Sequence, residues 1–288
     1  MSIVTRFAPS PTGFLHLGHV YSALTAFRLA RTNGGRFLLR IEDIDPTRYR
    51  TAYRAAIEED LQWLGLSWDG PIRIQSEHLP AYRTVLNNLS AQGLIYPCFC
   101  TRADIAREIA GSAAAPHAPD GSAVYPGTCR ALPKSVRAAR LAAGETPALR
   151  LDMNRAMSAV PSPLTFTELD EGEIICDPAP FGDVVLARKD APASYHLCVT
   201  HDDAIQGVTL VTRGIDLKPA THLHRLLQAL MGWPKPSYAH HRLLTDEAGR
   251  RLAKRDKAAT VRTLRQQGLS AVEVRAMAGF ADQSDLPG

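Results

Sequence analysis

The chain has 288 residues, of which 45% are hydrophobic and 22% are charged, and its formal net charge is +4. This composition is close to that of an average soluble globular protein, so it excludes a coiled coil, a collagen and a largely disordered chain. No apolar run approaches the ~18–20 residues that span a bilayer, and a proline-rich turn begins at Pro9, too early for a signal peptide. We therefore expect a cytoplasmic protein with no membrane partner. The small basic excess permits a nucleotide or nucleic-acid partner and does not require one.

The first third of the chain predicts alternating strands and helices. The expected strands cover residues 3–8 and 37–41, and the expected helices run from Leu17 to about residue 33 and from Asp45 to about Leu64. In the second helix, Asp45 is the expected N-cap and Pro46 the first helical residue. A strand–helix–strand unit of this length predicts the right-handed crossover of a parallel sheet. The expected fold class is therefore α/β, with a doubly wound parallel sheet of the Rossmann type.

Residues 96–180 have a different composition, with clustered cysteines, a stretch rich in Ala, Pro, Gly and Ser at 111–128, and a helical period only around 134–143. We expect an insertion with its own small fold. The α/β pattern then returns, with expected strands at 183–188, 195–200 and 208–212 and a helix at 219–231. The expected division is a first half of the α/β core at 1–95, the insertion at 96–180, the second half of the core at 181–255 and a short helical tail at 256–288.

The segment from Pro9 to His19 lies between the first expected strand and helix. In an open α/β sheet this position binds ligands, and the backbone N–H groups at a helix N-terminus favour phosphate. His16 and His19 are three residues apart, so we expect them to share the first helical turn and face the same way. Gly18 would let a phosphate or a flat ring approach the backbone. The segment therefore predicts a nucleotide site, the alternative being two surface histidines that cap a helix.

A second basic segment lies late in the chain, where four of the six residues 250–255 are Lys or Arg. A lysine beside a transferred phosphoryl group is a recurring catalytic device. Taken alone, this segment favours a solvated basic loop over a phosphate-binding one.

Three cysteines, Cys98, Cys100 and Cys129, fall close together in the sequence. Thiolates are preferred ligands of zinc, which takes four ligands in a tetrahedron. The fourth ligand could be Tyr125 or His117, and spacing alone does not decide between them. Cys176 and Cys198 have no partners in the sequence, and we expect Cys198 to lie in a buried strand.

Taken together, the segment from Pro9 to His19 and the basic segment at 250–255 resemble the two signature motifs of class I aminoacyl-tRNA synthetases. The neighbouring sequences are similar to glutamyl-tRNA synthetases over nearly the whole chain and in the same order. The segments that carry this resemblance are RFAPSPTGFLHLGH (6–19), GGRFLLRIEDIDPTR (34–48), LQWLGLSWD (61–69), HDDAIQGVTLVTRGIDL (201–217) and RLAKR (251–255).

The resemblance implies roles for individual residues. Arg6 would reach the side-chain carboxylate of glutamate and Glu42 would hold its α-ammonium group. The residues implied in glutamate binding are Arg6, Phe7, Ala8, Pro9, Ser10, Glu42, Tyr195 and Arg213. The residues implied in binding ATP, which enters with Mg²⁺, are His16, Gly18, His19 and Lys254. The alternative for Arg6 and Arg213 is a structural ion pair with Glu42 or Asp43, and we expect Asp202 and Asp203 to support the neighbouring loops.

The resemblance also bears on the two remaining motifs. It selects Tyr125 as the fourth ligand of one structural zinc ion, with His117 as a bystander. The last basic loop departs from the family pattern Lys-x-Ser-Lys, because this chain reads Arg251, Leu252, Ala253, Lys254 and Arg255. The second lysine is retained, so we expect activation to survive the loss of the serine hydroxyl.

Only residues 256–288 follow this loop, where conventional glutamyl-tRNA synthetases carry an anticodon-binding domain. We expect no such domain here, and in this respect the chain resembles the shorter glutamyl-queuosine tRNA(Asp) synthetases. That resemblance implies a monomeric ligase that activates L-glutamate with ATP without tRNA and transfers it to queuosine in the anticodon loop of tRNA(Asp). The alternatives are a truncated glutamyl-tRNA synthetase that charges a tRNA 3′ end, a small-molecule nucleotidyltransferase or ligase, and a non-catalytic zinc-bearing RNA-binding module.

Overall fold

The computed structural model describes residues 2–45, 47–110, 117–244 and 259–280. Its strands are β1 (Val4–Phe7), β2 (Arg36–Ile41), β3 (Arg73–Ile74), β4 (Ile95–Cys98), β5 (Ala148–Leu151), β6 (Thr165–Glu168), β7 (Gly172–Ile175), β8 (Val185–Ala187), β9 (Leu210–Gly214) and β10 (Ser237–His241). Its α-helices are α1 (Leu17–Arg31), α2 (Thr51–Trp63), α3 (Leu79–Ala91), α4 (Arg102–Ala110), α5 (Lys134–Ala142), α6 (Met153–Ser158), α7 (Tyr195–Ile205), α8 (Ala220–Met231), α9 (Val261–Gln266) and α10 (Ala271–Met277).

The centre of the molecule is built from parallel strands. β1, β2 and β3 form one parallel sheet, and β9, β10 and β6 form another, to which β7 adds an antiparallel edge. The backbone N–H of Thr209 donates to the C=O of Val4 at 3.0 Å and joins β1 to the start of β9. This arrangement confirms the expected α/β class with parallel-sheet character.

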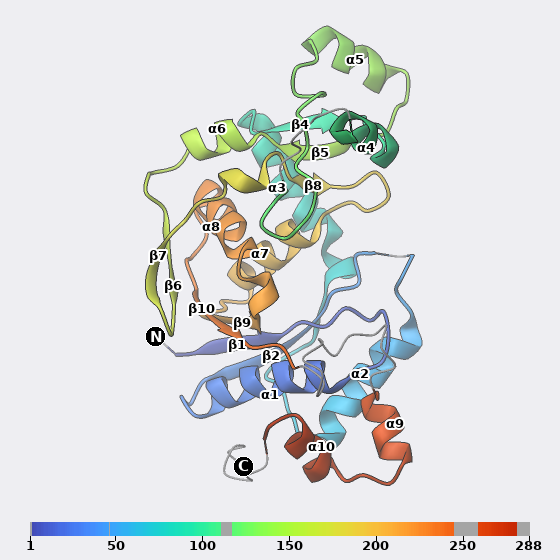
Figure 1. Ribbon diagram of the computed structural model, residues 1–288, viewed down its shortest axis with the longest axis vertical. Helices are drawn as coiled ribbons and strands as arrows, with labels where there is room; N and C mark the ends of the chain where they lie inside the picture. The colour runs from blue at the N-terminus through green and yellow to red at the C-terminus, as the bar shows by residue number, and fades with distance from the viewer. Residues whose placement is uncertain (1, 46, 111–116, 245–258, 281–288) are drawn as a thin grey trace.

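The expected insertion contains elements of two different sheets. Its strands β4 and β5 pair antiparallel with each other, and β5 also pairs antiparallel with β8. By contrast, β6 and β7 belong to the sheet of β9 and β10. Figure 1 shows α4 and α5 at one end of the long axis and α9 and α10 at the other, with the parallel strands between them. The division into four segments stays a prediction.

Helix α1 covers the sheet of β1 and β2 because its apolar side chains recur at helical spacing. Val20, Leu24 and Phe27 are buried against that sheet. The turn that follows needs a glycine at position 35, since a Cβ there would lie 2.1 Å from the backbone oxygen of Ile3. This close approach lets β2 pair directly with β1, and the carboxyl ends of both strands border the site described below.

Two expected elements differ in the structure. Residues 195–200, expected as a strand, begin helix α7, which Ser194 caps by accepting a hydrogen bond from the backbone N–H of Leu197. Cys198 is buried, as expected, but it lies in this helix. Helix α2 begins at Thr51 and not after Asp45. The Asp45 carboxylate accepts hydrogen bonds from the backbone and hydroxyl of Thr47, as an N-cap would, but the turn that follows is not continued into α2.

Candidate functional site

The parallel strands end at a cavity of about 620 Å³. The carboxyl ends of β1, β9 and β10 meet there with the start of α1 and α7, which is where open α/β sheets bind ligands. The cavity brings together nearly all of the predicted site residues: Arg6, Phe7, Ala8, Pro9, Ser10, His16, Gly18, His19, Glu42, Tyr195 and Arg213. The remaining predicted residues, Arg251, Leu252, Ala253, Lys254 and Arg255, lie outside the described residues.

Arg6 is buried and held from behind by a carboxylate. Its Nε donates to Oδ1 of Asp203 at 2.8 Å, and its Nη1 donates to the backbone oxygen of Thr212 at 3.0 Å. Asp203 also accepts a hydrogen bond from Nη2 of Arg40 at 2.6 Å. Burial by itself raises the pKa of Asp203, but the two guanidinium groups outweigh burial and the pKa is lowered. The ionic partner of Arg6 is therefore Asp203, and neither Glu42 nor Asp43.

Asp202, the neighbour of Asp203, is a second buried carboxylate that binds an arginine. Its carboxylate accepts hydrogen bonds from the hydroxyl of Tyr82 at 2.8 Å and the amide of Gln75 at 3.1 Å, and it pairs with Arg73 at 2.9 Å. Burial opposes the charge, but the hydrogen bond from His201 and the nearby arginines lower the pKa of Asp202 to about 2. The two aspartates thus anchor arginines of β1, β2 and β3, a more specific role than the expected support of loops.

Glu42 is the acidic residue of the cavity that lies at the end of β2. Burial raises its pKa to about 7, although Arg40 and Arg6 act in the opposite direction. With a pKa of about 7, this carboxyl group is only partly ionised in neutral solution. A cation that binds beside it favours the ionised form. The position therefore suits the α-ammonium group of an amino acid.

His16 and His19 lie together at the N-terminus of α1. His16 is the N-cap residue, one position before the helix, and its Nδ1 accepts a hydrogen bond from the backbone N–H of Gly18 at 3.1 Å. Nδ1 of His19 accepts a hydrogen bond from the backbone N–H of His16 at 3.3 Å, and the ring centroids are 3.8 Å apart. Both rings line the cavity beside the positive end of the helix dipole, where an anion is favoured.

A smaller cavity of about 370 Å³ adjoins the first. The two share Ser10, Thr12, Glu42 and Tyr195 as walls, and the smaller one extends along the segment between β2 and α2. The site therefore has a second chamber beside the group that suits an α-ammonium.

Several cavity residues were not predicted from the sequence. Gly214, Asp216, His241, Arg242, Leu243 and Leu244 form its far wall. They lie at the ends of β9 and β10 or just after them, so the rule that ligands bind at the carboxyl ends of parallel strands could have found them. Arg40 and Tyr82 could not have been found in this way, because their contacts with Asp203 and Asp202 span more than 100 residues of sequence.

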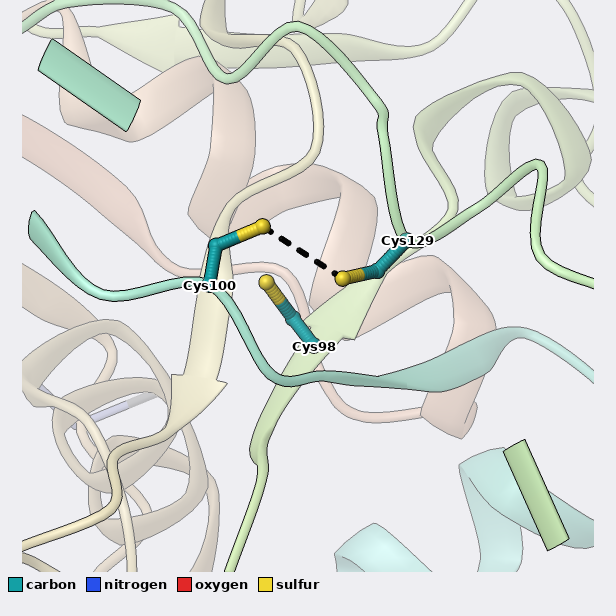
Figure 2. A group of neighbouring side chains, drawn as sticks. All are labelled: Cys98, Cys100 and Cys129. Atoms are coloured by element: carbon teal, nitrogen blue, oxygen red, sulfur yellow. Dashed lines mark hydrogen bonds between the residues drawn. The ribbon is translucent and has the colours of Figure 1, made fainter. Parts of the chain in front are cut away.

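The three predicted cysteines converge at the end of β4. The Sγ atoms of Cys98, Cys100 and Cys129 all lie within 4.8 Å of one another, and Figure 2 shows their side chains pointing toward a common centre. The hydroxyl of Tyr125 lies 3.4 Å from Sγ of Cys100. Burial raises the pKa of the Cys129 thiol, but hydrogen bonds from Tyr125 and the backbone of Phe99 outweigh it and lower the pKa to about 7. This set of soft donors could bind a metal ion.

His117 takes no part in this group of thiols, as expected, and forms an isolated β-bridge with Ala123. In the part of the chain that the structure describes, no helix is both long and apolar enough to cross a membrane.

Comparison with known proteins supports the interpretation of the cavity. The sequence profile of tRNA synthetases class I (E and Q), catalytic domain, matches residues 2–278. The chain belongs to this family. It is therefore a ligase-type enzyme with the class I synthetase catalytic fold, as the sequence predicted.

Among curated relatives, the chain is 48% identical to a glutamyl-Q tRNA(Asp) synthetase of Rhodobacter capsulatus, covering 96% of this chain and 100% of the relative. It is 43% identical to the protein of the same name from Nocardia farcinica, covering 98% and 85%. A glutamate–tRNA ligase of Aquifex aeolicus is 39% identical, and the chain covers 54% of it.

Among solved structures, a glutamate tRNA ligase from Elizabethkingia meningosepticum, in complex with its amino acid, superposes with a TM-score of 0.80 at 27% identity. The match covers all of this chain and 63% of that ligase, so the chain spans less than two thirds of its length.

Proposed function

We propose that the chain activates L-glutamate with ATP in the absence of tRNA and transfers it to the queuosine base in the anticodon loop of tRNA(Asp). The observation that supports this function most strongly is that the larger cavity is lined by Arg6 and Arg213, by a glutamate whose pKa is raised to about 7, and by the histidines of a helix N-terminus. These groups match the side-chain carboxylate, the α-ammonium and the phosphates of a glutamate–ATP pair. The relatives named glutamyl-Q tRNA(Asp) synthetase match almost the whole chain, which favours queuosine as the acceptor.

In the first step, the α-carboxylate of glutamate attacks the α-phosphate of ATP, bound with Mg²⁺, and pyrophosphate leaves. Arg6 and Arg213 bind the side-chain carboxylate of the substrate and Glu42 binds its α-ammonium, which leaves the α-carboxylate free to react. His16 and His19, with the N-terminus of α1 and Lys254, bind the phosphates and stabilise the charge that develops on them. The contribution of the protein is mainly positioning and charge stabilisation.

In the second step, a hydroxyl of the queuosine ring attacks the carbonyl carbon of the mixed anhydride. The ester forms and AMP leaves, and a phosphate oxygen of the adenylate takes the proton. The chamber beside Glu42 and Tyr195 gives the acceptor room to approach this carbonyl.

We propose that the cysteine cluster holds one structural zinc ion, with Cys98, Cys100, Cys129 and Tyr125 as ligands. The donor set fits, because three thiols and a phenol oxygen converge and supply the four ligands of a structural zinc ion. Bound there, zinc would connect β4 to the segment around Cys129 and take no part in the reaction.

Two measurements test the proposed function. ATP–pyrophosphate exchange should depend on glutamate with no tRNA added, and a strict requirement for tRNA would contradict the proposal. Labelled glutamate should then pass to queuosine-containing tRNA(Asp) and not to the same tRNA without queuosine. Transfer to the 3′ end of tRNA(Glu) would instead identify a truncated glutamyl-tRNA synthetase. The Aquifex aeolicus relative is named a glutamate–tRNA ligase.

A further inference from the structure

Arg213 is held by a chain of hydrogen bonds that lies behind the cavity. Its Nε donates to Nε2 of His240 at 3.1 Å, and its Nη2 donates to the hydroxyl of Thr221 at 2.6 Å. Its Nη1 lies 3.0 Å from Nδ1 of His224. Three of the five N–H groups of the guanidinium are thus used, and two have no partner among the residues that the structure describes.

These contacts fix the tautomers of both histidines. A guanidinium can only donate, so Nε2 of His240 and Nδ1 of His224 must both be unprotonated acceptors. His240 therefore carries its proton on Nδ1, where Oε2 of Glu168 lies at 2.6 Å. His224 carries its proton on Nε2, which faces Nδ1 of His196 at 3.1 Å. Each histidine is neutral and oriented by a further partner.

The surroundings keep these histidines neutral. Burial lowers the pKa of His240 to about 3, and the Arg213 charge acts in the same direction. Burial also lowers the pKa of His224 well below its usual value. The pair can therefore accept from Arg213 throughout the pH range in which proteins are folded and active.

Glu168 connects this network to the neighbouring strand β6. It is buried at the end of β6, and Oε1 also accepts a hydrogen bond from the backbone N–H of His240 at 2.8 Å. One carboxylate thus holds both the main chain and the ring of the residue that supports Arg213. A segment of the expected insertion contributes in this way to the wall of the amino-acid site.

We infer that Glu168, His240 and His224 are positioning residues for substrate recognition, which fix the Arg213 guanidinium so that its two remaining N–H groups meet the side-chain carboxylate of glutamate. The inference rests on the proposed function, in which Arg213 binds that carboxylate. The arrangement selects a carboxylate over an amide, because a locked guanidinium offers donors only and has no freedom to turn toward an amide oxygen alone.

The test separates the hydrogen-bond acceptor from the size of the side chain. His240→Gln keeps an acceptor near the position of Nε2, and His240→Leu removes it; His224→Asn and His224→Leu form the matching pair at Nδ1. The Michaelis constants for glutamate and for ATP are measured by pyrophosphate exchange in the full chain, with folding checked by circular dichroism.

We expect each leucine variant to raise the KM for glutamate by about 10-fold or more, the scale of a lost hydrogen bond to a charged group. The KM for ATP should change less than about twofold, and the Gln and Asn variants should retain most of the glutamate affinity. A leucine variant that folds and keeps the wild-type KM for glutamate would overturn the inference, as would equal losses in the leucine and the amide variants.

Glu168→Gln is a third, independent probe. The carboxylate accepts hydrogen bonds from both the backbone N–H and Nδ1–H of His240, and an amide has only one oxygen to accept them. When that oxygen pairs with the backbone, the amide nitrogen faces Nδ1 and favours the opposite tautomer, which places a proton against Nε of Arg213. The KM for glutamate should therefore rise while the folded state persists, and an unchanged KM would count against the inference. If the wild-type chain itself shows no glutamate-dependent exchange, the proposed function is wrong. If the wild-type chain shows this exchange but the variants do not show the expected rise in KM, only the positioning network is refuted.

Discussion

The sharing of Asp203 between Arg6 and Arg40 makes this carboxylate the residue on which the buried charge cluster depends. Removing its charge leaves Arg6 without its ionic partner and leaves Arg40 with only the longer contact to Asp202, at 3.9 Å. Breaking a buried ion pair in this way costs about 3–5 kcal/mol. We predict that Asp203→Asn lowers the free energy of unfolding by about 3 kcal/mol or more, measured by urea denaturation, and also raises the KM for glutamate.

The matched control is Glu145→Gln. Glu145 forms a two-contact ion pair with Arg140, at 2.8 and 2.6 Å, but both side chains are exposed. An exposed pair contributes at most about 1 kcal/mol. Equal destabilisation by the two substitutions would show that burial of the Asp203 cluster has no special energetic weight.

The raised pKa of Glu42 predicts a pH dependence of substrate binding. Only the ionised carboxylate attracts the α-ammonium, and with a pKa of about 7 the ionised fraction increases from pH 6 to pH 8. The KM for glutamate should therefore fall about 5-fold to 10-fold over this interval, which follows from the ionised fraction of one such group. Exchange assays at saturating ATP measure it.

Glu42→Gln provides the comparison for this effect. The amide does not titrate, so the variant should have a higher KM for glutamate that is nearly independent of pH between 6 and 8. A wild-type KM that is flat over this range, or one that increases with pH, would rule out Glu42 as the group that binds the α-ammonium.

At the level of the elements, the sequence predicted most of the core but not all of its helices. Strands β1 and β2 and helix α1 are found close to where the sequence predicted them. Helix α8 ends at Gly232, as expected, and this glycine has the left-handed conformation. Helix α7 was mistaken for a strand because the residues from Leu197 to Asp203 are all buried, so no polar face marks the helical period. Its β-branched Val199 and Thr200 reinforced the error.

The candidate site was predictable where it depends on local sequence and not where it depends on tertiary contacts. The segment from Pro9 to His19 carries its glycines, prolines and histidines within eleven residues, and six of its residues line the cavity. By contrast, the hydrogen bond from Arg213 to His240 joins two neighbouring strands, and it depends on the register in which β9 pairs with β10. Such pairing is set by the assembled sheet, so spacing in the sequence does not reveal it.

The cysteine cluster leads to a prediction for the segment between β4 and β5. If zinc connects the end of β4 to the segment around Cys129, the purified wild-type chain should contain one zinc ion, and Cys98→Ser should lose it. Elemental analysis measures both. Cys176→Ser is the control, because Cys176 lies outside the cluster and its thiol donates to the backbone oxygen of His222, which a serine hydroxyl can also do. A folded wild-type chain without zinc would exclude the site.

For the molecule as a whole, the cavity joins parts of the chain that are distant in sequence. Its walls come from β1, β2 and α1 in the first half and from α7, β9 and β10 in the second, so a bound ligand contacts both parallel sheets. A ligand that binds only the folded state stabilises it by about 2.7 kcal/mol at a concentration of 100 Kd. For a chain of this size we expect L-glutamate at that concentration to raise Tm by about 5 °C.

Glutamine is the matched ligand for this measurement, since it differs only in replacing the side-chain carboxylate by an amide. It should shift Tm by less than about 1 °C at the same concentration, because an amide nitrogen facing the donors of Arg6 and Arg213 leaves them without an acceptor. Differential scanning calorimetry of the full chain measures both shifts. Equal shifts with the two amino acids would mean that the arginines of the cavity do not discriminate charge, and the interpretation of the site as a glutamate pocket would then be wrong.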